Sequence, residues 1–254
     1  MQKQKTQPTQ YNALSSDYKV ISTQDPSKVF VQYPNSLKFL GTISGKYILD
    51  VGCGNGILTR MIAARDATVV GYDISDAQIE LAINEETKRH LGITYLVAGP
   101  QTIEKKLESP PHSAKKFDAA NATLVLPYAR DEQELFAFFS STHTLLKTGG
   151  TFSGVILNPN YARHGINAYN RIFTTMGDNK IRIDFLDNYG TIKISAQCSD
   201  FSKPNYEQAA KKAGFSQFKW KPLVINPEGI AAMGTNFWNN YEKDCPYIGF
   251  IAKK

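Results

Sequence analysis

The sequence predicts one α/β domain in which helices cover both faces of a parallel β-sheet. Short apolar runs, typical of strands buried on both faces of a parallel sheet, alternate with helical segments through residues 47–157. A glycine-rich turn at residues 52–56 joins the first of these strands to the helix that follows. This order requires right-handed crossovers, and 254 residues that are 42% hydrophobic are enough for one substantial core.

The elements follow from the apolar spacing. Two lead-in helices are expected at residues 11–18 and 28–40, the second because its apolar residues recur at helical intervals. Strands are predicted at residues 47–51, 68–72, 93–98, 117–121 and 151–157. The helices between them are predicted at residues 57–65, from a cap at Ser75 to about residue 91, and at 132–146.

Residues 158–204 interrupt this alternation. We expect a helix at residues 166–175 and a hairpin of strands 181–186 and 191–197, joined by Asn188-Tyr189-Gly190. Ile181, Ile183 and Phe185 alternate with polar residues, so one face of the hairpin needs cover. The segment leaves a strand at its carboxyl end, where open α/β sheets bind ligands, and so we expect it to be a substrate lid.

The chain is completed by a helix at residues 205–214 and strands at residues 215–225 and 247–252. The predicted organisation is a single domain with a helical lead-in (1–44), a core (45–157), the inserted lid (158–204) and the C-terminal strands (205–254).

Composition and charge bear on the partners, the location and the metal sites that we expect for this protein. The net charge is +6, but basic residues occur as scattered pairs, so we expect a solvated surface and no nucleic-acid partner. No stretch approaches the roughly 18 apolar residues of a membrane span, and the polar start lacks the apolar core of a signal peptide, so we expect a cytoplasmic protein. Cys53, Cys198 and Cys245 have no metal-ligand spacing, and no metal site is expected.

The glycine turn is the strongest functional signal. Glycines between a buried strand and a helix let backbone amides approach a ligand, and the helix amino end adds partial positive charge. A dinucleotide site needs Gly-x-Gly-x-x-Gly, whereas here Ile57 stands at the last position and Gly56 comes one residue early. Asp73 ends the second strand, where a carboxylate can accept from ribose hydroxyls.

Four segments in order, residues 49–56 (LDVGCGNG), 70–75 (VGYDIS), 117–121 (FDAAN) and 145–150 (LLKTGG), resemble the motifs of class I S-adenosylmethionine-dependent methyltransferases. The resemblance implies a Rossmann-like seven-stranded sheet with an antiparallel last strand. It also implies S-adenosyl-L-methionine as cofactor and S-adenosyl-L-homocysteine as product.

The resemblance assigns the methionine end of the cofactor, the ribose and the adenine to different parts of the chain. The cofactor-binding residues it implies are Tyr11, Asp50, Gly52, Cys53, Gly54, Asp73, Ile74, Gln78, Gly99, Pro100, Gln101 and Asn121. One departure lies after the third strand, where many relatives carry an acid that accepts from the adenine amine. Gly99 stands there, so Gln101 or a backbone carbonyl must replace that acceptor.

A second resemblance, carried by residues 11–14, 158–160, 227–230 and 236–238, is to toxoflavin synthase-like methyltransferases. It implies N-methylation of a fused heteroaromatic ring, with Tyr11 and Trp238 as positioning candidates and no assigned catalytic residue. A ring nitrogen with a free lone pair needs no general base. The alternatives are another small metabolite such as a quinone, RNA or protein as acceptor, and a non-catalytic binder. The oligomeric state is left open.

Overall fold

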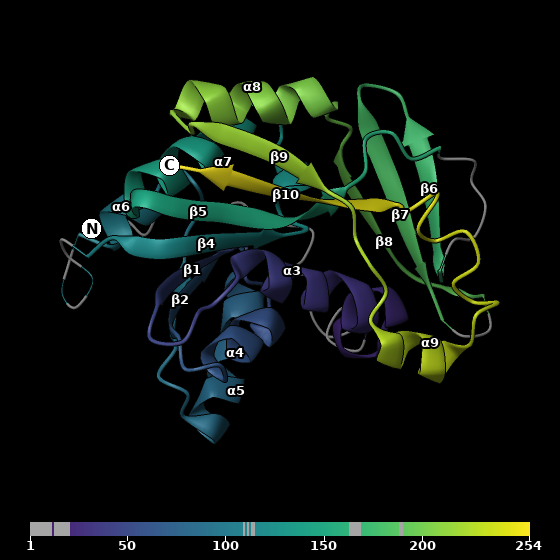
Figure 1. Ribbon diagram of the computed structural model, residues 1–254, viewed down its shortest axis with the longest axis horizontal. Helices are drawn as coiled ribbons and strands as arrows, with labels where there is room; N and C mark the ends of the chain where they lie inside the picture. Colours follow the sequence, from purple (N-terminus) through teal and green to yellow (C-terminus); the bar gives the residue numbers. More distant parts are fainter. Residues whose placement is uncertain are drawn as a thin grey trace.

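A mixed seven-stranded sheet forms the centre of the molecule (Figure 1). The computed structural model describes residues 12, 21–108, 110, 112, 115–162, 169–187 and 190–254. The strands of the large sheet are β1 (Tyr47–Val51), β2 (Thr68–Asp73), β3 (Thr94–Val97), β4 (Phe117–Thr123), β5 (Leu146–Leu157), β9 (Gln217–Lys221) and β10 (Tyr247–Lys253).

The strand order is β3-β2-β1-β4-β5-β10-β9. Strands β1 to β5 are parallel, and β10 runs antiparallel between β5 and β9. This confirms the predicted fold class, including the antiparallel last strand. The chain order reverses between the adjacent strands β1 and β4, and such a reversal is where open α/β sheets bind ligands.

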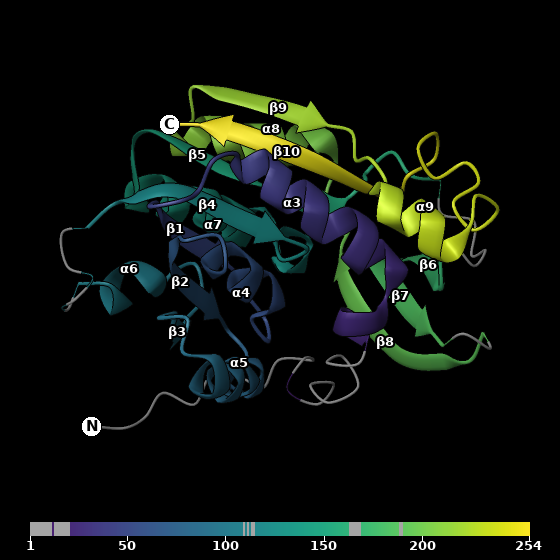
Figure 2. The same ribbon diagram turned by 60° about the horizontal axis from the view of Figure 1, so that its bottom comes forward.

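Helices pack on both faces, as predicted (Figure 2). One apolar cluster buries Ile62 and Ile79 on one face, and a second buries Leu135, Phe139 and Tyr206 on the other. The first face carries α3 (Tyr33–Leu40), α4 (Ile57–Ala63) and α5 (Asp76–Arg89), and the second carries α6 (Ile103–Lys106), α7 (Glu132–Leu145) and α8 (Lys203–Ala213). The shorter elements are the π-helical η1 (Lys28–Gln32), the 3-10 turn η2 (Leu126–Tyr128) and α9 (Pro227–Met233). In the part of the chain described, no helix has the length and apolarity to cross a bilayer.

The inserted segment forms a second sheet of three antiparallel strands, β6 (Arg171–Met176), β7 (Lys180–Leu186) and β8 (Ile192–Ser199). The predicted hairpin is confirmed, although Asn188 and Tyr189 of its turn lie outside the described residues. The helix predicted at residues 166–175 is wrong from Arg171 onward, because that part is strand β6; residues 166–168 lie outside the described residues. Ile172, Thr174 and Thr175 are β-branched and pair with β7.

The small sheet lies beyond the carboxyl ends of β4 and β5 (Figures 1 and 2). Ser199 Oγ donates to the carbonyl of Ala129 at 2.6 Å, which ties β8 to the loop after β4. One apolar cluster joins Leu157 at the end of β5 to Ile181 and Ile183 of β7. The insertion therefore sits on the ligand-binding side of the sheet, where the sequence predicts it.

Candidate active site

The glycine loop joins β1 to α4 at the switch point and needs two of its glycines for steric reasons. Gly52 and Gly56 have φ angles of +65° and +77°, which disfavour any side chain. A Cβ on Gly52 would lie 2.2 Å from Cγ2 of Val125, and one on Gly56 would lie 2.4 Å from the hydroxyl of Tyr95. The loop is thus held against the chain that follows β4.

Asp50 lies buried beneath the loop, opposite Asn121 in the parallel pairing of β1 and β4. Nδ2 of Asn121 donates to Asp50 Oδ1 at 2.8 Å, and the hydroxyl of Thr59 donates to Oδ2 at 2.6 Å. Burial raises the pKa of Asp50 to about 6, against the lowering by these two donors. A carboxylate held in this way favours a cationic group beside it, because a nearby positive charge repays part of the desolvation.

Asp73 ends β2, the strand next to β1, and its carboxylate binds the glycine loop. Its Oδ2 accepts from the backbone amide of Gly54 and its Oδ1 from that of Ser75, each at 2.9 Å. Each carboxylate oxygen has two lone pairs, so both keep acceptor capacity for a ligand hydroxyl. Burial raises the pKa of Asp73.

An apolar surface adjoins Asp73. Ile74 exposes 45% of its surface, which is high for a large apolar residue. A Cβ on Gly99 would lie 3.7 Å from Cδ1 of Ile74, so the segments after β2 and β3 meet there. The amide of Gly99 donates to Thr102 Oγ1 at 3.0 Å, and Pro100 has no amide hydrogen. The polar side chain that this segment offers is Gln101, whose Nε2 lies 3.5 Å from Glu134 Oε1.

Gln78 carries the most direct sign of a ligand site. Its side chain is 1% exposed, and among the described residues neither its Nε2 nor its Oε1 has a hydrogen-bond partner. A Cβ on Gly54 would lie 3.8 Å from Oε1 of Gln78, so the orphaned amide lies beside the glycine loop. Buried polar groups are normally paired, and this one can be paired by a polar ligand in the loop.

Two further predicted residues have different surroundings. The Sγ of Cys53 packs against β2, where a Cβ on Gly71 would lie 3.0 Å from it, and burial raises the pKa of this thiol well above its usual value. Its backbone, and not its sulfur, belongs to the loop. Tyr11 lies outside the described residues, but the adjacent Asn12 accepts from Ser75 Oγ at 2.5 Å.

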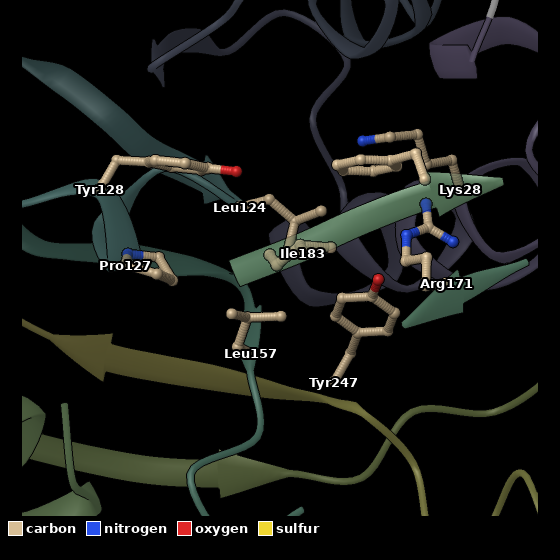
Figure 3. Close-up of a pocket in the computed structure, with 9 residues that line it drawn as sticks. Lys28, Leu124, Pro127, Tyr128, Leu157, Arg171, Ile183 and Tyr247 are labelled. Carbon is tan, nitrogen blue, oxygen red and sulfur yellow. The ribbon is translucent and has the colours of Figure 1, made fainter. Parts of the chain in front are cut away.

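A pocket opens beside the loop, between the ends of β4 and β5 and the small sheet (Figure 3). Its walls are Lys28, Leu124, Pro127, Tyr128, Leu157, Arg171, Ile183, Phe185 and Tyr247. Leu124 lines this pocket, and the next residue, Val125, abuts Gly52. Because consecutive Cα atoms are about 3.8 Å apart, the pocket and the glycine loop are immediate neighbours.

Trp238 is not among the residues that line this pocket. It is 5% exposed, its Nε1 donates to the carbonyl of Gly229 at 2.8 Å, and its ring stacks on Tyr169 with centroids 6.0 Å apart. This placement gives Trp238 a packing role, and its role in positioning a substrate stays a prediction. Among the described residues, no group of three or more His, Cys, Asp or Glu is placed to hold a metal ion.

Sequence reasoning missed the polar wall of the pocket, which comes from Lys28, Arg171, Tyr128 and Tyr247. These residues lie on η1, β6, η2 and β10, four elements far apart in the chain. No local spacing connects them. The structure does bring together the predicted Asp50 with Asn121, and Gly54 with Asp73 and Gln78.

Comparisons with known proteins agree with this geometry. Residues 48–150 match the family model described as a methyltransferase domain. A ubiquinone biosynthesis O-methyltransferase of Coxiella burnetii (strain Dugway 5J108-111) is 30% identical over 131 residues, which are 50% of this chain and 52% of that protein. The match thus spans about half the length of this relative.

Two solved structures share the fold over nearly the whole chain. An S-adenosylmethionine-dependent methyltransferase from Clostridium acetobutylicum ATCC 824 gives a TM-score of 0.65 at 14% identity, covering 95% of this chain and 98% of that one. One from Mesorhizobium loti gives 0.61 at 20% identity, covering 91% and 99%. Residues 48–150 therefore match a methyltransferase domain, and the chain shares its overall fold with S-adenosylmethionine-dependent methyltransferases of known structure.

Proposed function

We propose that this chain transfers a methyl group from S-adenosyl-L-methionine to a small molecule bound in the pocket beside the glycine loop. The observation that carries the proposal is the buried amide of Gln78, which has no hydrogen-bond partner among the described residues and lies beside Gly54. The amide of Gly54 in turn donates to Asp73. These groups fit a nucleoside joined to an amino acid. The adjoining pocket marks the side of the loop on which the acceptor would bind.

In this proposal, Asp73 accepts from the ribose hydroxyls and Gln78 pairs its amide with the cofactor. The surface formed by Ile74 and Gly99 receives the adenine ring, and Gln101 accepts from its amine. Asp50 and Asn121 lie under the methionine end, where the carboxylate of Asp50 favours a positive charge. Bound S-adenosylmethionine would supply an electrophilic methyl group, so the main task of the protein is to align the acceptor. Such alignment can lower a barrier by about 7–11 kcal/mol.

The proposed acceptor atom is a nitrogen of a heteroaromatic ring. Supporting this, none of the described residues that line the pocket is His, Asp or Glu, and a ring nitrogen with a free lone pair needs no general base. A second candidate is a hydroxyl oxygen, such as that of a phenol, because the Coxiella burnetii relative is named an O-methyltransferase. A phenol must lose its proton before or during transfer, so this candidate requires an acceptor of that proton.

The test is transfer of labelled methyl groups by the full chain to a panel of azaheterocycles, a panel of catechols, total RNA and casein. We expect transfer to at least one azaheterocycle. Asp73→Ala should weaken cofactor binding by roughly 1–3 kcal/mol, the usual cost of unpaired hydrogen-bonding groups. Asp76→Ala, which removes an exposed carboxylate three residues away, is the matched control and should leave binding unchanged.

Transfer to catechols alone would select the oxygen-methylating alternative. Transfer to RNA or casein alone would overturn a small-molecule function. Cofactor binding without transfer to any acceptor would favour a non-catalytic binder.

A further inference from the structure

The pocket beside the loop is lined by a buried arginine, Arg171. Arg171 begins β6 and is 1% exposed. Its Nη1 forms an ion pair with Asp25 Oδ2 at 2.7 Å and also donates to the carbonyl of Tyr169 at 3.3 Å. Its Nη2 has no hydrogen-bond partner among the described residues. A buried charged group that lacks one of its hydrogen bonds carries a large desolvation cost.

The surroundings of Arg171 divide the pocket into two sides. Figure 3 shows Arg171 and Lys28 at one end of the pocket and Pro127 and Tyr128 at the other, with Leu124 and Ile183 between them. The guanidinium carbon lies 5.0 Å from the ring centre of Phe185 and 5.8 Å from that of Tyr247. The pocket thus combines flat apolar walls with one cationic edge, which is how sites for small aromatic ligands are usually built.

We propose that the methyl acceptor carries an anionic oxygen, a carboxylate or an ionised ring oxygen, that accepts a hydrogen bond from Nη2 of Arg171. The inference rests on the proposed function and adds the charge of its substrate. Arg171 and Lys28 are the two charged residues that line the pocket in the described part of the chain. Arg171 forms an ion pair with Asp25.

A purely structural role for Arg171 is the rival explanation. The pair with Asp25 joins the lead-in segment to the small sheet, and it would do so without any ligand. Structural pairs of arginine with a carboxylate frequently use two parallel N–H···O bonds. Here Oδ2 of Asp25 pairs with Nη1, while its Oδ1 accepts from the backbone amide of Lys28 at 2.9 Å. Nη2 is left for another acceptor.

The test compares acids with neutral isosteres as ligands of the full chain saturated with S-adenosylhomocysteine. Quinaldate and quinaldamide probe the carboxylate, and lumazine and dimethyllumazine probe the ionised ring oxygen. Dissociation constants are measured by calorimetry in wild type, in Asp25→Asn/Arg171→Met and in Arg171→Lys. The paired substitution removes both buried charges together and keeps an oxygen at residue 25 for the amide of Lys28. Arg182→Met, which removes an exposed arginine of the small sheet, is the matched control.

We expect wild type and Arg182→Met to bind at least one acid about tenfold or more tightly than its neutral isostere, as one charged hydrogen bond allows. The paired variant should lose this preference while its affinity for S-adenosylhomocysteine is unchanged. Arg171→Lys should retain only part of it. A preference for quinaldate would identify the anionic group as a carboxylate, and a preference for lumazine would identify it as an ionised ring oxygen.

Two results would overturn the inference. One is a wild type that binds acids and isosteres equally, which decides the matter even if the variants fail to fold. The other is a preference that survives in the paired variant. Failure of S-adenosylhomocysteine itself to bind would instead count against the proposed function, so the two failures are distinguishable.

Discussion

Replacing Gln78 with leucine should stabilise the ligand-free protein and weaken cofactor binding at the same time. In the structure, both polar atoms of the buried Gln78 side chain lack partners among the described residues, so the folded state bears their desolvation cost. That cost is about 1–3 kcal/mol. Leucine has a similar size and is a good helix former at this position near the start of α5. We therefore expect the free energy of unfolding of Gln78→Leu to rise by about 1–2 kcal/mol.

The same substitution removes the hydrogen bonds that Gln78 would give the cofactor. We expect the dissociation constant of S-adenosylhomocysteine to rise about 5- to 100-fold, corresponding to about 1–3 kcal/mol. Urea unfolding measures the first effect and calorimetry the second. Thr142→Val is the matched control, because Thr142 lies on the far face of the sheet in α7 and its buried hydroxyl also lacks a described partner.

Thr142→Val should stabilise the protein without changing cofactor affinity. If Gln78→Leu binds S-adenosylhomocysteine as tightly as wild type, the amide does not serve the cofactor. If the variant is less stable than wild type by more than about 1 kcal/mol, the amide has a partner in solution, and the desolvation argument fails.

Two further variants test the loop. Because burial raises the pKa of Asp50 to about 6, ligand-free wild type should lose up to about 3 kcal/mol of unfolding free energy as the pH rises from about 4 to about 6. Asp50→Asn should lose less over the same pH range. Equal slopes of unfolding free energy against pH in the two proteins would contradict the assignment. Gly52→Ala should cost about 1 kcal/mol for its positive φ plus about 1–3 kcal/mol for the contact with Val125. Gly92→Ala is the control and should cost only the energy of the positive φ, because φ is +76° there and no atom lies within 4 Å. In a double-mutant cycle, Val125→Gly should recover the energy lost to the contact with Val125 in Gly52→Ala, and an additive cycle would refute that contact.

Local patterns were sufficient to predict the large sheet, whereas the residues at its switch point were assigned by the resemblance to methyltransferases. Asp50 and Asn121 lie on different strands, but each stands near the carboxyl end of a predicted parallel strand, and the structure joins them by a hydrogen bond. Ser75 was predicted to cap a helix, and its hydroxyl accepts from the amide of Gln78 at 3.2 Å. These predictions succeeded because strand ends, caps and glycine turns are determined by a few adjacent residues.

Some element boundaries were missed although local signals existed. Strand β5 begins at Leu146 and not at residue 151, because the glycine pair at residues 149–150 is accommodated within the strand, with Gly149 at φ +76°. Helix α9 was not predicted, yet Asn226 caps it and Pro227 occupies its first turn, which is a common start for a helix.

The polar wall of the pocket depends on tertiary contacts and could not be predicted from local patterns. Arg171 looked like part of a helix, and its charge partner Asp25 comes from the lead-in segment. The side-chain amide of Gln78, which has no partner in the described part of the chain, is equally a property of three-dimensional packing, because it depends on what surrounds a side chain and not on its neighbours in sequence.

The central claim, that the glycine loop holds S-adenosylmethionine, is tested most directly by calorimetric titration of the wild-type chain with S-adenosylmethionine and with NAD under identical conditions. The loop has Ile57 where a pyrophosphate site needs glycine, so we expect micromolar binding of S-adenosylmethionine and no detectable binding of NAD. Tighter binding of NAD than of S-adenosylmethionine would contradict the claim.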